Sequence, residues 1–263
     1  MHSLHNITLA GFPGFAAYGD AEKKRPPLLF LHGAFADHSN FENWANFFAQ
    51  KGYDAIALSR RGRNGLAPEN AKGLKFQNYL DDVMAQVKAC ERKPILVGHS
   101  LGGLLAMKAA EEGHAEAVVL VCTAPPAMLT AQLGSLPSFA PLMPGIIFGN
   151  PIMPDYAGLR YVALNAMPEE DAKRVAKKVL HESGIVYRQM LFGAIRLKSE
   201  GLPCPVLCIA AGKDRIVSMG LNRYTARRTR ATLLEYPESG HFIIEEPGSE
   251  KAKNDLLAWL QTL

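Results

Sequence analysis

The sequence is poor in several features that indicate other classes of protein. Only 4 of its 263 residues are cysteines, too few for a disulfide scaffold, and Cys204 and Cys208 lack the spacing of a zinc or redox motif. No apolar stretch approaches the ~18 to 20 residues that span a bilayer. Residues 1–6 show no basic start followed by an apolar run, as a secretory signal would. We therefore expect buried free thiols and a cytoplasmic protein without a membrane span.

Charge of a single sign is also lacking. The chain has 29 Lys and Arg against 25 Asp and Glu, for a net charge of +4, and the two signs are interspersed along most of its length. Two short basic clusters, at residues 60–63 and 227–230, are interpreted as a solvated loop and a solvated helix end, because no nucleic-acid motif accompanies them. No nucleic-acid partner is expected.

What is present is apolar material in a regular order. At 48% hydrophobic and 21% charged residues, the chain can bury a sizeable core. Short apolar runs predict strands, a break at Pro13-Gly14 predicts an edge hairpin, and stretches of helical period alternate with the strands. This alternation predicts an α/β fold with a mostly parallel sheet flanked by helices. The predicted strands are 28–31, 55–58, 95–97, 118–121, 206–210 and 232–236, the hairpin is 7–18, and the helices are near 41–51, 76–90, 101–112, 218–229 and 248–262.

One region interrupts this rhythm. From Pro125 to about Glu200 the chain is rich in proline, has helical material around 169–197, and shows no convincing strand. We interpret 125–200 as a cap inserted over the carboxyl ends of the strands, where ligands bind in open α/β sheets. The core domain would then comprise 1–124 and 201–263. The alternative is an irregular packing subdomain.

The pentapeptide Gly98-His99-Ser100-Leu101-Gly102 matches the pattern G-x-S-x-G. It follows a predicted strand and opens a predicted helix, so a sharp turn would lift the Ser100 side chain clear of the sheet. The helix N-terminus favours developing negative charge. We predict that Ser100 is a nucleophile, and that His99 packs the turn instead of acting as the base.

A serine nucleophile needs a base, and the base needs a carboxylate. His241 lies in a turn directly after the last predicted strand, and Asp214 directly follows the strand at 206–210. The order Ser, Asp, His along the chain is the one expected for this architecture. Glu238 and Glu245 are the alternative acids.

Acyl transfer also needs donors for the tetrahedral oxyanion. The N–H of Leu101 opens the helix after Ser100 and is one candidate. The other comes from the loop His32-Gly33-Ala34-Phe35 after the strand at 28–31. We choose the Ala34 N–H, with that of Phe35 as the alternative.

Taken together, these motifs resemble the α/β-hydrolase superfamily, in the group of serine esterases, haloperoxidase-like perhydrolases and carbon–carbon bond hydrolases. The likeness spans nearly the whole chain, although the chain has Ser59-Arg60-Arg61-Gly62 where members often carry an Asp before the Arg-Gly turn. The resemblance implies an α/β-hydrolase fold with a largely helical cap inserted after the sixth strand. The cap would shape an apolar pocket, although most of its apolar residues are expected to fill its own interior. The candidate pocket residues are Phe35, Leu129, Leu133, Phe139, Met143, Ile147, Phe148, Met153 and Met190.

The expected function is hydrolysis of a small-molecule carboxylic ester through a Ser-His-Asp triad, with no metal and no organic cofactor. Cleavage of a carbon–carbon bond, a lactone, a thioester or an amide by the same triad remains open. A ligand-binding protein with an idle triad on the same fold is the alternative of another class. Epoxide or haloalkane hydrolysis is disfavoured, because those relatives carry an Asp where Ser100 stands. The sequence leaves the oligomeric state open.

Overall fold

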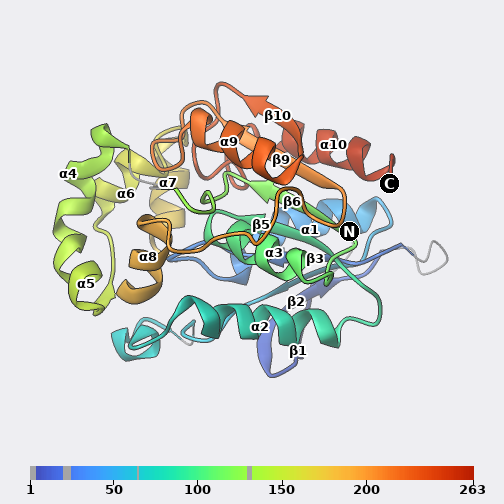
Figure 1. Cartoon of the computed structure of the whole chain (residues 1–263), viewed down its shortest axis with the longest axis horizontal. Helices are drawn as coiled ribbons and strands as arrows, with labels where there is room; N and C mark the ends of the chain where they lie inside the picture. Colours follow the sequence, from blue (N-terminus) through green and yellow to red (C-terminus); the bar gives the residue numbers. More distant parts are fainter. Residues whose placement is uncertain (1–3, 20–24, 64, 129–131) are drawn as a thin grey trace.

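The computed structural model describes residues 4–19, 25–63, 65–128 and 132–263, and an eight-stranded sheet forms its centre (Figure 1). The order along the sheet is β1-β2-β4-β3-β5-β6-β9-β10. From β4 to β10 neighbouring strands are parallel, whereas β2 is antiparallel to both β1 and β4. The strands are β1 (His5–Leu9), β2 (Phe12–Ala17), β3 (Leu28–Leu31), β4 (Ala55–Leu58), β5 (Ile95–His99), β6 (Ala117–Val121), β9 (Val206–Ala211) and β10 (Thr232–Tyr236).

All six strands predicted from apolar runs are confirmed, but the predicted position of the hairpin turn is wrong. The chain reverses at Ala10 and Gly11, which adopt φ angles of 53° and 82°, as a two-residue hairpin turn requires. Gly14 instead lies inside β2, where a Cβ atom would come within 2.0 Å of the Ala57 carbonyl oxygen. The absence of a side chain at Gly14 therefore allows β2 to lie close to β4.

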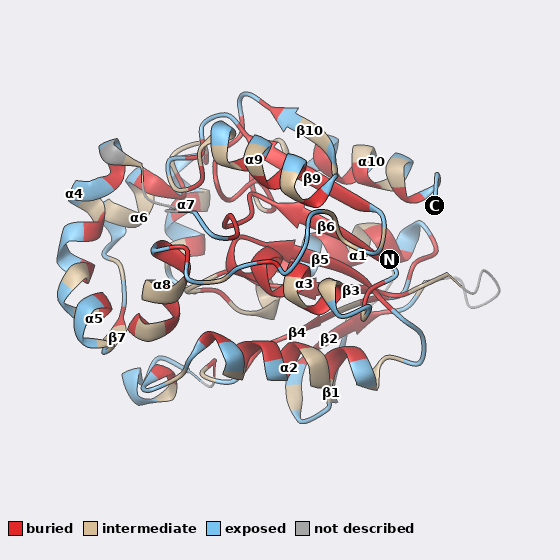
Figure 2. Ribbon diagram, in the orientation of Figure 1, coloured by how far each residue is buried: buried red, intermediate tan, exposed pale blue. Residues whose placement is uncertain are grey.

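Helices cover both faces of the sheet (Figure 2). The strand side chains alternate between the two faces. Leu28 and Phe30 belong to the apolar cluster that contains residues of the helices at 42–50 and 249–260. Leu29 and Leu31 belong to the cluster that contains residues of the helices at 76–89, 101–111 and 219–229. This period of two is the pattern of a strand buried on both faces. The five predicted core helices are confirmed as α1 (Glu42–Gln50), α2 (Phe76–Ala89), α3 (Leu101–Glu111), α9 (Met219–Thr229) and α10 (Ser249–Leu260).

The chain between β6 and β9 forms the inserted region, whose helices gather at one end of the molecule (Figure 1). Contrary to the prediction that it holds no strand, β7 and β8 form a small antiparallel sheet. Each of these strands has 2 residues, which is too short to show periodicity in a sequence. The elements are α4 (Leu136–Phe139), α5 (Met143–Phe148), β7 (Pro151–Ile152), α6 (Tyr156–Val162), α7 (Glu169–Ala176), β8 (Glu182–Ser183) and α8 (Gly184–Leu191).

The inserted region is not packed apart from the rest of the molecule. Leu164 of this region belongs to one of the two core clusters, and Met190 belongs to the other. The division into a core and a cap at residues 125–200 stays a prediction. Among the helices in the described ranges, none has the length and apolar character to cross a membrane.

Candidate active site

Ser100 occupies a strained turn between β5 and α3. Its φ and ψ angles are 52° and −116°, a conformation that is rare for a residue with a side chain and that a protein must hold in place. The Ser100 N–H donates to the Val121 carbonyl at 3.0 Å, and the Ser100 carbonyl accepts from Gly103 N at 3.1 Å and Ala124 N at 3.3 Å. Hydrogen bonds from the end of β6 and the residues after it therefore hold the turn that carries the Ser100 hydroxyl.

The two glycines of the pentapeptide allow the backbone to pack closely around this turn. A Cβ atom at Gly102 would lie 2.0 Å from the Leu31 carbonyl oxygen, and one at Gly98 would lie 2.5 Å from Gly103 N. Real Cβ atoms do not approach backbone atoms so closely. Any side chain at either position would push α3 away from the sheet, and the serine would move with it.

His241 and Asp214 form a buried hydrogen-bonded pair beside this turn. The His241 Nδ1 lies 2.8 Å from Asp214 Oδ2, and the two side chains are 4% and 0% exposed. An ionised carboxylate only accepts, so the proton lies on Nδ1 and the Nε2 atom keeps a free lone pair. His241 therefore carries the tautomer that a general base requires.

The Asp214 carboxylate is held from its other side by backbone amides. Its Oδ1 atom accepts from Ile216 N at 2.7 Å and from Val217 N at 2.9 Å. The loops that carry the acid and the base are also joined, because Lys213 N donates to the Ser239 carbonyl at 2.8 Å. The strands before Ser100, Asp214 and His241 are all parallel, so the three residues emerge at one edge of the sheet.

The two alternative acids are engaged elsewhere. The Glu238 side chain is 85% exposed and pairs with Lys213 at 2.6 Å. Glu245 accepts from Asn40 Nδ2 at 2.7 Å and pairs with Arg174. Asp214 is thus the acid that contacts His241.

His99 does more than pack the turn. It is buried, its ring centre lies 4.9 Å from that of His241, and its Nε2–H donates to the His241 carbonyl at 2.8 Å. Burial, and then the neighbouring His241 ring, lower the pKa of His99 to about 3, so it stays a neutral donor. This contact was not predicted from the sequence, where its only signal was a titratable side chain beside Ser100.

The two predicted oxyanion donors belong to segments that adjoin Ser100. Leu101 is the first residue of α3, and Ala34 lines the same pocket as Ser100. Gly33 precedes Ala34, and a Cβ atom at Gly33 would stand 3.3 Å from Ser100 Cβ. Phe35, the alternative donor, adopts a φ angle of 60°, which marks the turn as a second strained point at this edge of the sheet.

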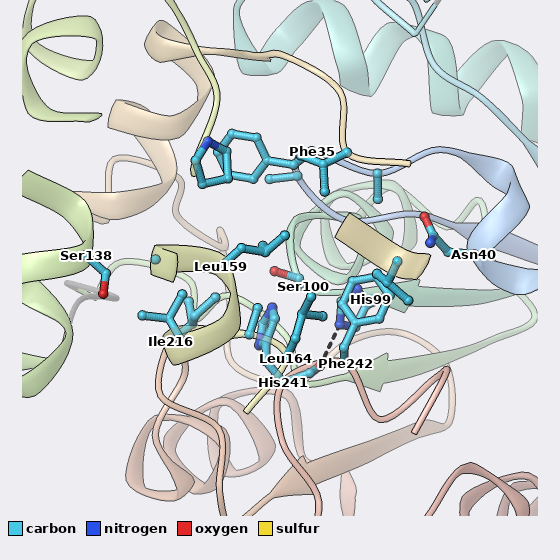
Figure 3. Close-up of a pocket in the computed structure, with 18 of the residues that line it drawn as sticks. Phe35, Asn40, His99, Ser100, Ser138, Leu159, Leu164, Ile216, His241 and Phe242 are labelled. Atoms are coloured by element: carbon cyan, nitrogen blue, oxygen red, sulfur yellow. Dashed lines mark hydrogen bonds between the residues drawn. The ribbon is translucent and has the colours of Figure 1, made fainter. Parts of the chain in front are cut away.

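A cleft that opens to solvent is lined by Ser100 and His241 (Figure 3). In Figure 3 the Ser100 hydroxyl points into this cleft. The inserted region supplies much of the wall through Phe139, Leu159 and Leu164. A predominantly apolar wall around a few polar groups is typical of a small-molecule site.

The predicted pocket residues divide into two groups. Phe35 and Phe139 line the cleft, whereas Met143, Phe148 and Met190 are not among its lining residues. Met190 is buried in a core cluster, Met143 packs against the same cluster, and Phe148 is 77% exposed at the end of α5. The sequence shows that such residues are apolar, but not which way each one faces. Ile147 and Met153 are also exposed, Leu129 lies outside the described residues, and the side chain of Leu133 is not described.

The interpretation of residues 60–63 as a solvated loop is also wrong in part. Arg60 and Arg63 are buried, and Arg63 forms an ion pair with Glu182 of β8. The ion-pair partner of Arg63 lies 119 residues away in sequence, so no local pattern could have revealed this contact. In the second basic cluster, Arg227 and Arg230 are exposed as expected.

Comparison with known proteins gives the family. A model described as "Alpha/beta hydrolase family" matches residues 28–252. The chain belongs to the alpha/beta hydrolase family. The match includes the strands that precede Ser100, Asp214 and His241.

Three known proteins are similar to this chain. A non-heme chloroperoxidase from Burkholderia pyrrocinia is 33% identical over 116 residues, which are 42% of this chain and 41% of that relative's length. The AB hydrolase superfamily protein YisY from Bacillus subtilis (strain 168) is 26% identical over 256 residues, covering 88% of this chain and 90% of the relative. The crystal structure of a Paleococcus ferrophilus monoacylglycerol lipase has the same fold, with a TM-score of 0.72 at 19% identity and 98% of each chain covered.

Proposed function

We propose that this alpha/beta hydrolase is a serine carboxylesterase, in which Ser100 attacks the carbonyl carbon of an ester with a moderately apolar acyl or alcohol group. The observation that carries the proposal is the buried hydrogen bond from His241 Nδ1 to Asp214 Oδ2 at 2.8 Å, beside a cleft that Ser100 shares with His241. An apolar cleft wall favours an uncharged acyl or alcohol chain. The monoacylglycerol lipase of the same fold is named for an ester substrate.

The first half of the reaction forms an acyl-enzyme. His241 Nε2 takes the hydroxyl proton as Ser100 Oγ bonds to the carbonyl carbon, and the carbonyl electron pair moves onto oxygen. The N–H groups of Ala34 and Leu101 stabilise this oxyanion. When the tetrahedral intermediate collapses, His241 gives the proton to the leaving alcohol.

The second half releases the acid. His241 removes a proton from water while the water oxygen bonds to the acyl carbon, and the second tetrahedral intermediate expels Ser100 Oγ, which takes the proton back. Asp214 stabilises the imidazolium in both halves and holds the ring in place. No step needs a metal or an organic cofactor.

The test is hydrolysis of p-nitrophenyl esters of increasing acyl length by the wild-type protein and by Ser100→Ala. We expect turnover by the wild type, and a loss of about 10³-fold or more in the variant at an unchanged melting temperature. Equal turnover by the two proteins would refute Ser100 as the nucleophile. Turnover of lactones, thioesters, amides or diketones in place of esters, still dependent on Ser100, would keep the triad and replace the substrate class.

A further inference from the structure

Arg60, which follows β4, makes an unusual set of contacts with the loop that carries Ala34. It is 1% exposed, and its guanidinium donates to the His32 carbonyl at 2.7 Å and to the Gly33 carbonyl at 3.1 Å. Its backbone N–H donates to His32 Nε2 at 3.3 Å. Burying a guanidinium is costly, and burial lowers the pKa of Arg60 to about 10. A purely apolar side chain would fill this space without that cost.

The contacts fix the direction of one backbone amide. In a trans peptide the carbonyl and the N–H of the next residue point in opposite directions. Because the Gly33 carbonyl points toward the Arg60 guanidinium, the Ala34 N–H must point away from it. Gly33 itself lies against Ser100, since a Cβ atom at Gly33 would be 3.3 Å from Ser100 Cβ.

We propose that Arg60 is a positioning residue, which turns the Ala34 N–H toward the oxyanion that forms at Ser100. The inference rests on the proposed function, because it assigns a role in the hydrolysis of an ester. Arg60 does not line the cleft, and its guanidinium acts through the carbonyls of His32 and Gly33.

His32 supports the same arrangement. Its Nε2 atom accepts from the Arg60 N–H, so the ring proton is on Nδ1, which lies 3.0 Å from the Gly33 carbonyl oxygen. Burial, and then the charges of Arg60 and Arg63, hold the pKa of His32 well below its ordinary value. The ring is therefore a neutral link between the loop and Arg60 across the working pH range.

The inserted region supplies the negative charge that permits two buried arginines. Glu182 of β8 pairs with Arg63, and its other oxygen accepts from the Tyr79 hydroxyl at 2.6 Å. The Arg60 guanidinium carbon lies 5.0 Å from the centre of the Tyr79 ring. The inserted region also contacts the loop directly, because Leu180 N donates to the Phe35 carbonyl at 2.9 Å. The loop is thus held by Arg60 on one side and by the inserted region on the other.

The test compares Arg60→Met with Arg63→Met. Both substitutions remove a buried guanidinium from the same cluster, but only the first removes the guanidinium's hydrogen bonds to the carbonyls of His32 and Gly33. The readouts are kcat, KM, the melting temperature, and the inhibition constants of butylboronic acid and of butyramide. Butylboronic acid forms a tetrahedral adduct on a reactive serine, whereas butyramide resembles the ground state.

We expect Arg60→Met to lower kcat by about 10- to 100-fold, because loss of a whole oxyanion donor costs about 10²- to 10³-fold. The inhibition constant of butylboronic acid should rise by the same factor, while KM and butyramide binding stay within about 3-fold. Arg63→Met should lower the melting temperature without changing the ratio of the inhibition constants of butylboronic acid and butyramide. Arg60→Lys keeps one donor and should recover part of kcat. If Arg60→Met does not fold, Arg60→Lys is tested on its own. A lower kcat and weaker binding of butylboronic acid, at the melting temperature of the wild type, would then support Arg60 as a positioning residue.

Two results would overturn the inference. One is an unchanged affinity for butylboronic acid in both Arg60 variants, and the other is an equal loss in Arg60→Met and Arg63→Met that follows the melting temperature. If the wild type itself neither hydrolyses esters nor binds butylboronic acid at Ser100, the proposed function fails and takes the inference with it. If the wild type does both and the Arg60 variants behave like it, only the inference fails.

Discussion

The carboxylate of Asp214 binds the imidazole of His241 with one oxygen only, at 2.8 Å from Oδ2 to Nδ1. Its second oxygen is occupied by two backbone amides of the loop that follows. Because each oxygen has its own partners, the rotation of the carboxylate is fixed. The same partners would determine which way the amide of an asparagine at this position faces.

Asp214→Asn should inactivate the protein without unfolding it. The amide oxygen would keep the two backbone donors, so the NH2 group would face His241 and donate to Nδ1. The ring proton would then move to Nε2, which could no longer accept the Ser100 proton. We expect kcat for p-nitrophenyl butyrate to fall by about 10⁴-fold at a similar KM. Glu238→Gln, at the exposed alternative acid, should keep wild-type activity; a similar loss there would contradict the assignment.

His99 should make the fold sensitive to acid. Its pKa is about 3 in the folded protein, against an ordinary value of about 6.5 in the unfolded chain. Between these values the unfolded state binds more protons, so stability is complete above pH 6.5 and falls as the pH drops toward 3. The contribution is about 1.4 kcal/mol per pH unit within this window.

The measurement is urea denaturation of the wild type and His99→Gln at several pH values from 7 to 4. The glutamine amide can still donate to the His241 carbonyl but does not titrate. The free energy of unfolding of the variant should therefore fall less steeply with acid than that of the wild type. Parallel curves for the two proteins would show that His99 does not titrate as a buried neutral group.

Gly102→Ala should destabilise the fold. The new methyl would stand 2.0 Å from the Leu31 carbonyl oxygen, and either α3 or β3 would have to move. We expect a loss of about 3 kcal/mol in the free energy of unfolding. The matched control is Gly220→Ala, an exposed position in α9 where the nearest atom would be 3.7 Å away. That change should raise stability by up to about 1 kcal/mol, from helix propensity alone.

The cleft wall should set the acyl length that the protein accepts. Leu159 lines the same cleft as Ser100 (Figure 3), so Leu159→Trp fills space that a long acyl chain would occupy. We expect kcat/KM for p-nitrophenyl hexanoate to fall at least about 10-fold relative to that for the acetate. Phe148→Ala, at a residue that faces solvent, should leave this ratio unchanged. A shift in the control but not in Leu159→Trp would move the acyl site to another part of the surface.

The sequence predicted those features that depend on neighbouring residues. The strand before Ser100 was visible because a short apolar run precedes a glycine, and His241 and Asp214 stood out because each directly follows a strand. Parallel strands align their carboxyl ends, so these positions could be expected to meet from the sequence alone. The β-hairpin turn was misplaced because Ala10 takes a positive φ angle, which no sequence pattern marks.

Features that depend on distant partners were not predictable. Arg60 and Arg63 look like surface residues until Glu182 is placed beside Arg63. The direction of Phe148 depends on how the inserted region folds over the sheet. The contact of His99 with the His241 carbonyl joins residues 142 apart in sequence.

The most direct test of the central claim is the mass of the protein during turnover. Rapid acid quenching of wild-type protein mixed with p-nitrophenyl butyrate, followed by peptide mapping, should find a butyryl group on Ser100. The group should be absent from Ser100→Ala, and it should form far more slowly in His241→Ala. Hydrolysis that proceeds at the wild-type rate in Ser100→Ala, or a butyryl group mapped to another residue, would contradict the account.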